Sequence, residues 1–118
     1  MSVVQGNHAE SLAKAYLLKQ GLRFITHNFR SRLGEIDLIM QDKDVLVFIE
    51  VRARSSNGYG GALSSVTLSK QRKLVKTALY YLLKHNLHDK LPMRFDVVSL
   101  DGAQWQITWI KNAFDADV

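Results

Sequence analysis

Apolar residues recur along the chain with two spacings, and each spacing predicts one type of secondary structure. From Asn7 to Gln20 they recur every three or four residues, as in an amphipathic helix, with Asn7 in the position of an N-cap and Gly21 as a stop. A second stripe of this kind runs from Thr67 to Asn86, and threonine is again a capping residue type. We therefore expect two amphipathic helices.

Short runs rich in apolar and β-branched residues predict five strands. The runs cover Arg23–Arg30, Ile36–Met40, Val45–Ile49, Met93–Leu100 and Gln104–Ile110. Polar residues 41–44 and the pair Asp101-Gly102 provide hairpin turns. Trp105, Ile107 and Trp109 share one face of the last strand and are expected in the core. Because the second helix must cross over between the third and fourth strands, the pattern predicts an α/β domain of order α-β-β-β-α-β-β with a mixed sheet.

Two acidic residues interrupt the apolar pattern of neighbouring strands. Asp37 lies inside one run, and Glu50 follows the next run, two residues before Arg52. An ionised carboxylate withdrawn from water costs several kcal/mol unless it is paired or coordinated. Carboxylates on adjacent strands come within roughly 5 Å of each other, which suits Mg²⁺ or Mn²⁺ and hence phosphodiester cleavage. The alternative is that Glu50 pairs with Arg52 and Asp37 with another basic residue near water.

Composition narrows the class of protein. The 118 residues, 47% hydrophobic and 23% charged, predict one domain covering residues 1–118. The chain has no cysteine, which excludes disulfides and thiolate metal sites. The first residues lack a signal-peptide pattern, and no apolar run approaches the ~18 residues of a membrane span. We expect a cytoplasmic protein without membrane contacts.

The balance of charge favours a polyanionic partner. Sixteen lysines and arginines against eleven acidic residues give a formal net charge of +5, and the expected site is itself acidic, so the excess of positive charge elsewhere is larger still. Lys70, Arg72 and Lys73 gather at the start of the second helix, where the helix dipole does not favour cations. We expect these three residues to contact phosphates, although a solvated helix face would show the same run of charge.

Three further residues extend the candidate site. Gln71 is the polar member of an apolar helical stripe, so it either lines the pocket or is a half-buried glutamine at a frayed helix end. Arg54, on the strand face shared with Glu50, and Tyr59, which could stack on a base, are additional candidates for nucleic-acid contacts. Tyr59 belongs to the Gly- and Ser-rich segment 55–65, which lacks the phosphate-loop signature and equally fits a plain flexible connection.

Glu10 has two interpretations that the local pattern does not separate. With Asn7 as the N-cap, Glu10 would be the third helical residue, where its carboxylate reaches back to the cap in a capping box. Glu10 would then be structural. In the other interpretation its carboxylate joins Asp37 and Glu50 in the site.

The order of Glu10, Asp37 and Glu50-x-Arg52 across helix, strand and strand resembles the PD-(D/E)XK nuclease superfamily. The resemblance is to archaeal-type Holliday-junction resolvases and, closely and over nearly the whole chain, to the small bacterial YraN family. It runs through residues 6–10, 34–37, 48–52, 70–71 and 112–114. It implies a restriction-endonuclease-like αβββαβ core, flanked by helices and extended by a C-terminal hairpin strand. Ile36 replaces the proline of the superfamily motif, and Arg52 replaces its usual lysine.

The resemblance also implies roles for individual residues. The metal ligands would be Glu10, Asp37 and Glu50, holding Mg²⁺ or Mn²⁺, and Arg52 and Gln71 would complete the catalytic set. We expect a nucleic-acid-binding protein with a metal-dependent endonuclease site for structured DNA. The alternatives are a non-catalytic nucleic-acid-binding protein of the same fold and an interaction adaptor. Symmetric cutting of a junction would favour a homodimer.

Overall fold

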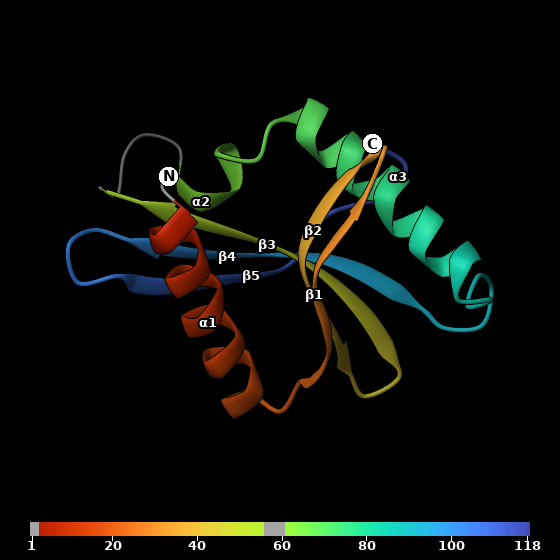
Figure 1. The fold of residues 1–118 in the computed structure, drawn as a ribbon, viewed down its shortest axis with the longest axis horizontal. Helices are drawn as coiled ribbons and strands as arrows, with labels where there is room; N and C mark the ends of the chain where they lie inside the picture. The colour runs from red at the N-terminus through yellow and green to blue at the C-terminus, as the bar shows by residue number, and fades with distance from the viewer. Residues whose placement is uncertain (1–2, 56–60) are drawn as a thin grey trace.

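A single five-stranded mixed sheet organises the fold, with one long helix on each face (Figure 1). The computed structural model describes residues 3–55 and 61–118, with side chains from residue 8 onward. The helices are α1 (Val3–Lys19), α2 (Gly61–Ser64) and α3 (Leu68–Lys84), and the strands are β1 (Arg23–Ser31), β2 (Gly34–Asp42), β3 (Val45–Arg54), β4 (Met93–Asp101) and β5 (Gln106–Phe114).

The strands lie in the sheet in their sequence order, β1 to β5. All neighbours are antiparallel except β3 and β4, which are parallel over nine residue pairs and are joined by a crossover containing α2 and α3. The predicted meander, crossover and C-terminal hairpin are therefore confirmed. None of the described helices is both long and apolar enough to cross a membrane.

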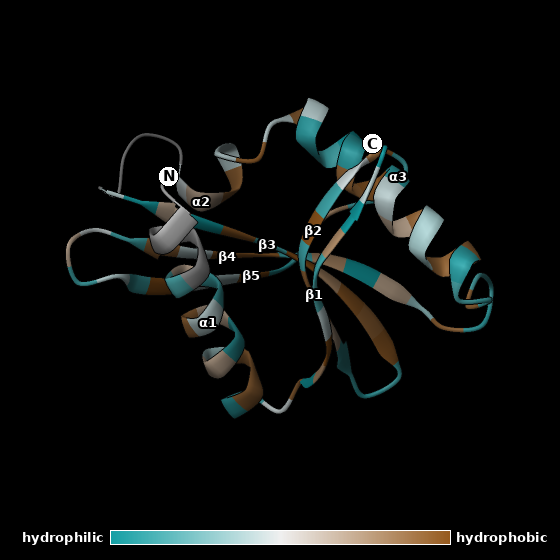
Figure 2. Ribbon diagram, viewed as in Figure 1, coloured by the Kyte–Doolittle hydropathy of each residue, from teal (hydrophilic) through white to brown (hydrophobic). Residues whose placement is uncertain are grey.

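Each face of the sheet has its own hydrophobic core, because the side chains of β3 alternate between the two faces. Leu46 and Phe48 are buried under α3, whereas Val47 and Ile49 are buried under α1 together with Ala13. Figure 2 shows the first half of β3 in the hydrophobic colour and the first turns of α3 in the hydrophilic colour. The sheet is thus covered on both sides, and the polar start of α3 faces outward.

The two long helices test the capping predictions in opposite ways. α3 begins as predicted, since the side chain of Thr67 accepts the backbone N–H of Lys70 at 3.3 Å. α1 begins at Val3, so the expectation of an N-cap at Asn7 is wrong. Glu10 consequently lies two turns inside the helix, where the N-terminal N–H groups that a capping box satisfies are out of reach. The capping interpretation of Glu10 is therefore excluded.

The last hairpin differs from the prediction in its burial. The expected face of β5 packs at the rim of the α1-side core, and its apolar residues are partly rather than fully buried; they are Ile107 and Trp109, with Trp105 in the preceding turn. The short helix α2 was not predicted, because four residues are too few for a periodic pattern.

Candidate functional site

A break in the sheet creates the candidate site. The antiparallel ladder between β2 and β3 ends at Leu38 and Ile49, although β2 stays paired with β1, and β3 with β4, beyond that point. Figure 1 shows the β1–β2 hairpin rising toward α3 while β3 runs away from it. Continuing the register by one residue would place Asp37 opposite Glu50. The strands therefore separate at the two acidic residues singled out in the sequence.

Asp37 occupies the backbone that this separation exposes. Its Oδ2 accepts the N–H of Val51 at 2.8 Å, a donor on the side of β3 that faces β2. The strand also twists here, because Ile36 is buried in the α3-side core, whereas Leu38, which strict alternation would place on the same face, is buried in the α1-side core. The carboxylate of Asp37 is thereby held between the two strands.

Glu50 is half-buried and lines the same pocket as Asp37. Burial, as the largest cause, together with the side chain and charge of Asp37 raises the pKa of Glu50 to about 9, although the charges of Arg52 and Lys70 lower it. At neutral pH the Glu50 carboxyl thus holds its proton. A bound cation would favour loss of that proton, because it would stabilise both carboxylates.

The structure does not show the alternative in which Glu50 pairs with Arg52 and Asp37 with another basic residue. Among the described residues, neither Asp37 nor Glu50 has a basic nitrogen within the 4.0 Å of an ion pair. Asp96 is another acid within an apolar strand and is almost fully buried. Its carboxylate accepts hydrogen bonds from Arg94, the Trp109 indole and the Asn112 backbone. Asp96 is thus held by partners within the fold, whereas the side chains of Asp37 and Glu50 have no basic partner in the described chain.

Glu10 approaches the pair from α1. Burial, as the largest cause, together with the charges of Asp37 and Glu35 raises the pKa of Glu10 to about 7, although the charge of Arg30 lowers it. Glu10 is thus electrostatically coupled to Asp37. However, among the side chains that the structure describes, no three histidine, cysteine or acidic groups are arranged so that they could hold a metal ion. Of the three predicted ligands, the structure brings Asp37 and Glu50 into the lining of one pocket and places Glu10 in the lining of another.

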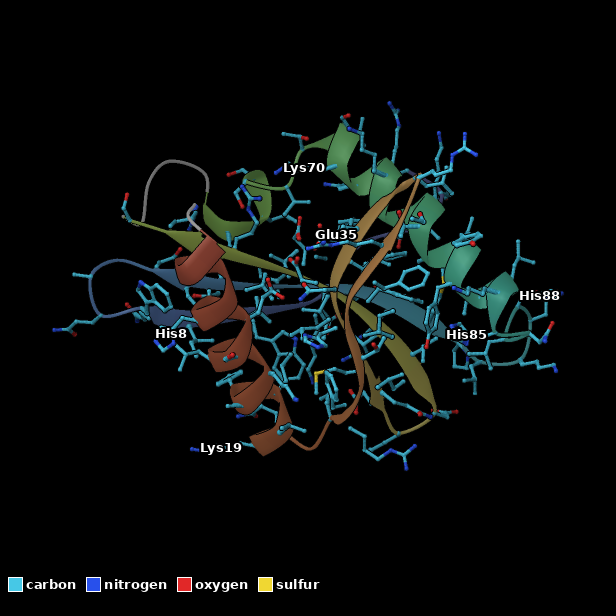
Figure 3. The ribbon with its side chains drawn as sticks, viewed as in Figure 1. His8, Lys19, Glu35, Lys70, His85 and His88 are labelled. Carbon is cyan, nitrogen blue, oxygen red and sulfur yellow. The ribbon has the colours of Figure 1, made fainter. Side chains whose placement is uncertain are left out.

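A pocket of about 300 Å³ lies between the acidic pair and α3. Its lining combines acids from the sheet with cations from the helix: Gly34, Glu35, Asp37, Glu50, Lys70, Lys73 and Leu74. Lys70 and Lys73 are exposed, so their ammonium groups are accessible at its rim. Figure 3 shows Lys70 at the start of α3 and Glu35 on β2 below it. Arg72 is also exposed on α3 but is not among the described lining residues.

Gly34 sets how closely β2 approaches α3. Its φ is +155°, and a Cβ atom built there would lie 2.9 Å from the hydroxyl oxygen of Thr77 and 3.6 Å from the carbonyl oxygen of Lys73. That hydroxyl donates to the same carbonyl at 2.7 Å, which holds it in place. The β1–β2 turn therefore packs directly on the helix that carries Lys70 and Lys73.

Arg52 is half-buried two residues from Glu50. In the described part of the chain its guanidinium forms no ion pair, although its charge acts to lower the pKa of Glu50. A guanidinium near two carboxyls and bound to neither is available to an anionic ligand.

Three other predicted site residues have different outcomes. The Gln71 amide donates to the carbonyl of Val66 at 3.0 Å, so this residue ties down the segment before α3 and is not among the described pocket-lining residues. Arg54 places Nε and Nη2 on the carboxylate of Asp101, at 2.7 and 3.1 Å, and Nη1 on the carbonyl of Gly61 at 2.7 Å. This corrects the expectation for Arg54, whose guanidinium is engaged within the fold. Tyr59 lies outside the described residues.

The sequence pattern missed a second pocket, between α1 and β1, that includes Lys14, His27 and Asn28. The available signal was the polar pair His27-Asn28 in an otherwise mixed strand, which is weak. His85 and His88 lie exposed at the end of α3 (Figure 3).

Comparison with known proteins gives a consistent set of relatives. The family model described as "Uncharacterised protein family UPF0102" matches residues 9–100. A UPF0102 protein of Legionella pneumophila strain Corby is 50% identical over 98% of both chains, and one of Coxiella burnetii is 55% identical over 95% of this chain and 92% of its own. A UPF0102 protein of Colwellia psychrerythraea is 51% identical over 96% of this chain and 90% of its own.

Among solved structures, one described as Pyrococcus furiosus SfsA in complex with Ca²⁺ aligns with a TM-score of 0.36 at 14% identity. The alignment covers 92% of this chain and 62% of the other. This degree of likeness supports no conclusion about the present chain.

Proposed function

This chain belongs to the UPF0102 family, which is the YraN family expected from its sequence motifs, and from that premise we propose that it is a metal-dependent endonuclease acting on structured DNA in the cytoplasm. The acidic pair at the break in its sheet supports this proposal. The observation that carries the proposal is the position of Asp37 and Glu50 in one pocket at this break, as two carboxyls without a basic partner in the described chain. The roles given to individual residues below are those implied by the resemblance to PD-(D/E)XK nucleases.

The donor set fits a hard divalent cation. Mg²⁺ and Mn²⁺ accept carboxylate oxygens, and Mg²⁺ typically takes only one or two carboxylates while keeping water and phosphate as its other ligands. Asp37 and Glu50 would hold the ion, and Glu10 would add negative charge from α1. When bound, such an ion stabilises the charge that develops on phosphate oxygens during hydrolysis.

The protein's own groups supply binding and orientation. Arg52, with no ion pair in the described chain, would hold a phosphate oxygen through its planar fork of donors. Lys70 and Lys73 at the rim of the acidic pocket would hold the neighbouring backbone, with Arg72 contributing charge. Arginine stays protonated, so Arg52 cannot act as the general base that a lysine with a lowered pKa could become.

That property of Arg52 favours one alternative function. A protein that binds nucleic acid without cleaving it needs the cationic surface and the phosphate-binding guanidinium but no proton acceptor at this position. The acidic pair would then bind a metal that bridges protein and phosphate without turnover.

Two measurements test the proposal. Titrating Mn²⁺ should raise the melting temperature of the wild-type protein by mass action, whereas Asp37→Asn and Glu50→Gln should respond little. Cleavage of junction, flap and single-stranded DNA should then depend on Mn²⁺ or Mg²⁺, with purified Asp37→Asn as the contamination control. Cleavage no greater than that of Asp37→Asn on every substrate would exclude the endonuclease and leave the binding function. Equal metal responses in all three proteins would remove the metal site.

A further inference from the structure

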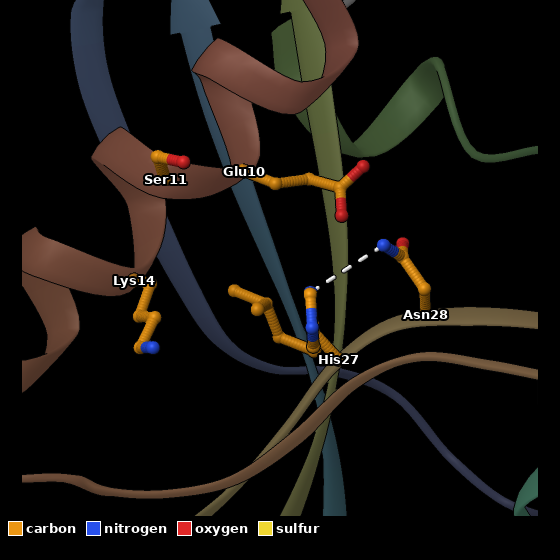
Figure 4. Close-up of a pocket in the computed structure, with 6 residues that line it drawn as sticks. Glu10, Ser11, Lys14, His27 and Asn28 are labelled. Carbon is orange, nitrogen blue, oxygen red and sulfur yellow. Dashed lines mark hydrogen bonds between the residues drawn. The ribbon is translucent and has the colours of Figure 1, made fainter. Parts of the chain in front are cut away.

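The second pocket lies on the opposite face of the sheet from α3, next to Glu10. It has a volume of about 290 Å³ and is lined by Glu10, Ser11 and Lys14 of α1, by His27 and Asn28 of β1, and by Leu38. Figure 4 shows Glu10, Lys14, His27 and Asn28 arranged around this space. The charge of Asp37 acts on Glu10, so this pocket is electrostatically linked to the acidic pair.

Lys14 presents a cation that no carboxylate neutralises in the described part of the chain. It lies four residues after Glu10, a spacing that often gives an ion pair on a helix. No such pair is present within 4.0 Å. Instead the ammonium lies 3.7 Å from the centre of the Phe24 ring, where a cation–π contact fixes its position and leaves its charge in place.

Asn28 and His27 supply neutral donors on the other wall of the pocket. Asn28 has a φ of +51°, and the β1–β2 register includes His27 and Phe29 but skips Asn28. Its amide Nδ2 lies 3.4 Å from His27 Nδ1. The tautomer that accepts this contact at Nδ1 carries its proton on Nε2, so the imidazole has an N–H to offer a ligand.

We propose that this pocket binds a second backbone phosphate of the same nucleic acid, on the other side of the acidic pair from Lys70 and Lys73. An ammonium, an imidazole N–H and an amide N–H are all donors, and phosphate oxygens are acceptors. The proposal rests on the proposed nucleic-acid binding and adds an orientation to it. The backbone would cross the open end of the break between β2 and β3, from the α3 face of the sheet to the α1 face.

The first test measures the affinity for a labelled junction DNA at several salt concentrations in EDTA, so that the result does not depend on metal or cleavage. Lys14→Met keeps the aliphatic stem over Phe24 and removes the charge. Losing one phosphate contact should reduce the magnitude of the log–log salt slope by roughly 0.9. Lys19→Met, an equal change at an exposed position of α1, is the matched control and should keep the wild-type slope.

A second variant separates hydrogen bonding from charge. Asn28→Gly tolerates the positive φ and removes the amide, so it should weaken binding and leave the salt slope unchanged. Thermal melting of each variant shows whether it is folded. Replacing single DNA phosphates by neutral methylphosphonates should reveal one position that matters to the wild type and Lys19→Met but no longer to Lys14→Met.

The outcomes distinguish this proposal from the proposed function. Wild-type protein without salt-dependent binding would overturn both. Binding that weakens on charge reversal at Lys70 and Lys73, but is the same for Lys14→Met and Lys19→Met, would overturn the second phosphate contact alone.

Discussion

At the scale of single residues, buried acids in this sheet are accommodated in different ways. Asp96 is neutralised by Arg94 and further hydrogen-bonded by an indole and a backbone N–H. In the described part of the chain Asp37 and Glu50 have no such partners, and the pKa of Glu50 is raised. Glu50 therefore holds a proton that a cation can replace. The sequence pattern made Asp37 and Glu50 conspicuous but not Asp96, although Asp96 also interrupts an apolar strand; its partners are Arg94 on the same strand and Trp109 and Asn112 on β5.

The acidic pair predicts an unusual dependence of stability on pH. The pKa of Glu50 is raised by folding, so between about pH 4.5 and pH 9 the folded state binds more protons than the unfolded state. Stability must therefore fall as the pH rises through this window. Glu50→Gln removes this penalty and should be more stable than wild type by on the order of 1–3 kcal/mol at pH 8, converging near pH 4.5. Urea unfolding in EDTA measures it, with Asp44→Asn at an exposed position of the β2–β3 turn as control. Parallel pH curves for wild type and Glu50→Gln would show that folding does not raise the pKa of Glu50.

Replacing Asp96 should lower the stability of the fold, whereas replacing Glu50 should raise it. Asp96→Ala leaves Arg94 without its main partner and frees two other donors, so it should destabilise the fold by about 3–5 kcal/mol, the usual effect of breaking a buried pair. Asp44→Ala, an exposed acid in the β2–β3 turn, is the matched control and should change stability by less than about 0.5 kcal/mol. Urea unfolding at pH 7 compares the two. Equal losses would show that the Asp96 network adds little.

Arg52 carries the prediction about activity. If cleavage is observed, Arg52→Ala should lower its rate by about 10²-fold or more, the effect of losing one donor to a transition-state oxygen. Arg52→Lys should retain or improve the rate, since lysine also holds a phosphate. Single-turnover rates on the best substrate measure both changes. A rate unchanged in Arg52→Ala would place the guanidinium outside the reaction.

At the scale of secondary-structure elements, local sequence patterns predicted the features that depend on neighbouring residues. They did not predict the features that depend on tertiary contacts. The alternation along β3 and the Thr67 cap of α3 depend on neighbouring residues, and both were predicted. The start of α1 was placed at Asn7 because capping residues are preferred there, although the helix extends to Val3. The separation of β2 from β3 could not be predicted, because neighbouring residues do not encode it; it accompanies the packing of Gly34 against Thr77 of a helix more than forty residues later.

That contact gives a prediction for the β1–β2 turn. Gly34→Ala should destabilise the fold by about 2 kcal/mol or more, because alanine is strained at this φ and its Cβ would press on the Thr77 hydroxyl. Thr77→Ala in the same chain removes the steric part, so the double variant should recover some of the loss that Gly34→Ala alone causes. Urea unfolding of the four proteins forms the cycle. Strict additivity would show that the strain is confined to the backbone of residue 34.

At the scale of the whole molecule, the formal net charge of +5 is distributed around an acidic site. Binding of duplex DNA through three or four phosphates should give a log–log salt slope of roughly −3 to −4. Charge reversal at Lys70, Arg72 and Lys73 together should flatten this slope, because α3 places exposed cations at the rim of the acidic pocket. Affinities measured between low and physiological salt provide the test. A triple variant with the wild-type slope would mean that this helix face is merely solvated.

Because of the crossover between β3 and β4, the two halves of the site should form at different stages of folding. Asp37 and Glu50 belong to consecutive strands of a meander, and hairpins of this kind form within microseconds. Lys70 and Lys73 join them only when residues 55–92 have closed the parallel pairing, a slower, non-local step. A chain emerging from synthesis would therefore carry the two carboxyls of the acidic pair before it carries the cations of α3. The protein should acquire its affinity for polyanions in the last step of folding, so that incompletely folded chains do not engage nucleic acid through this site.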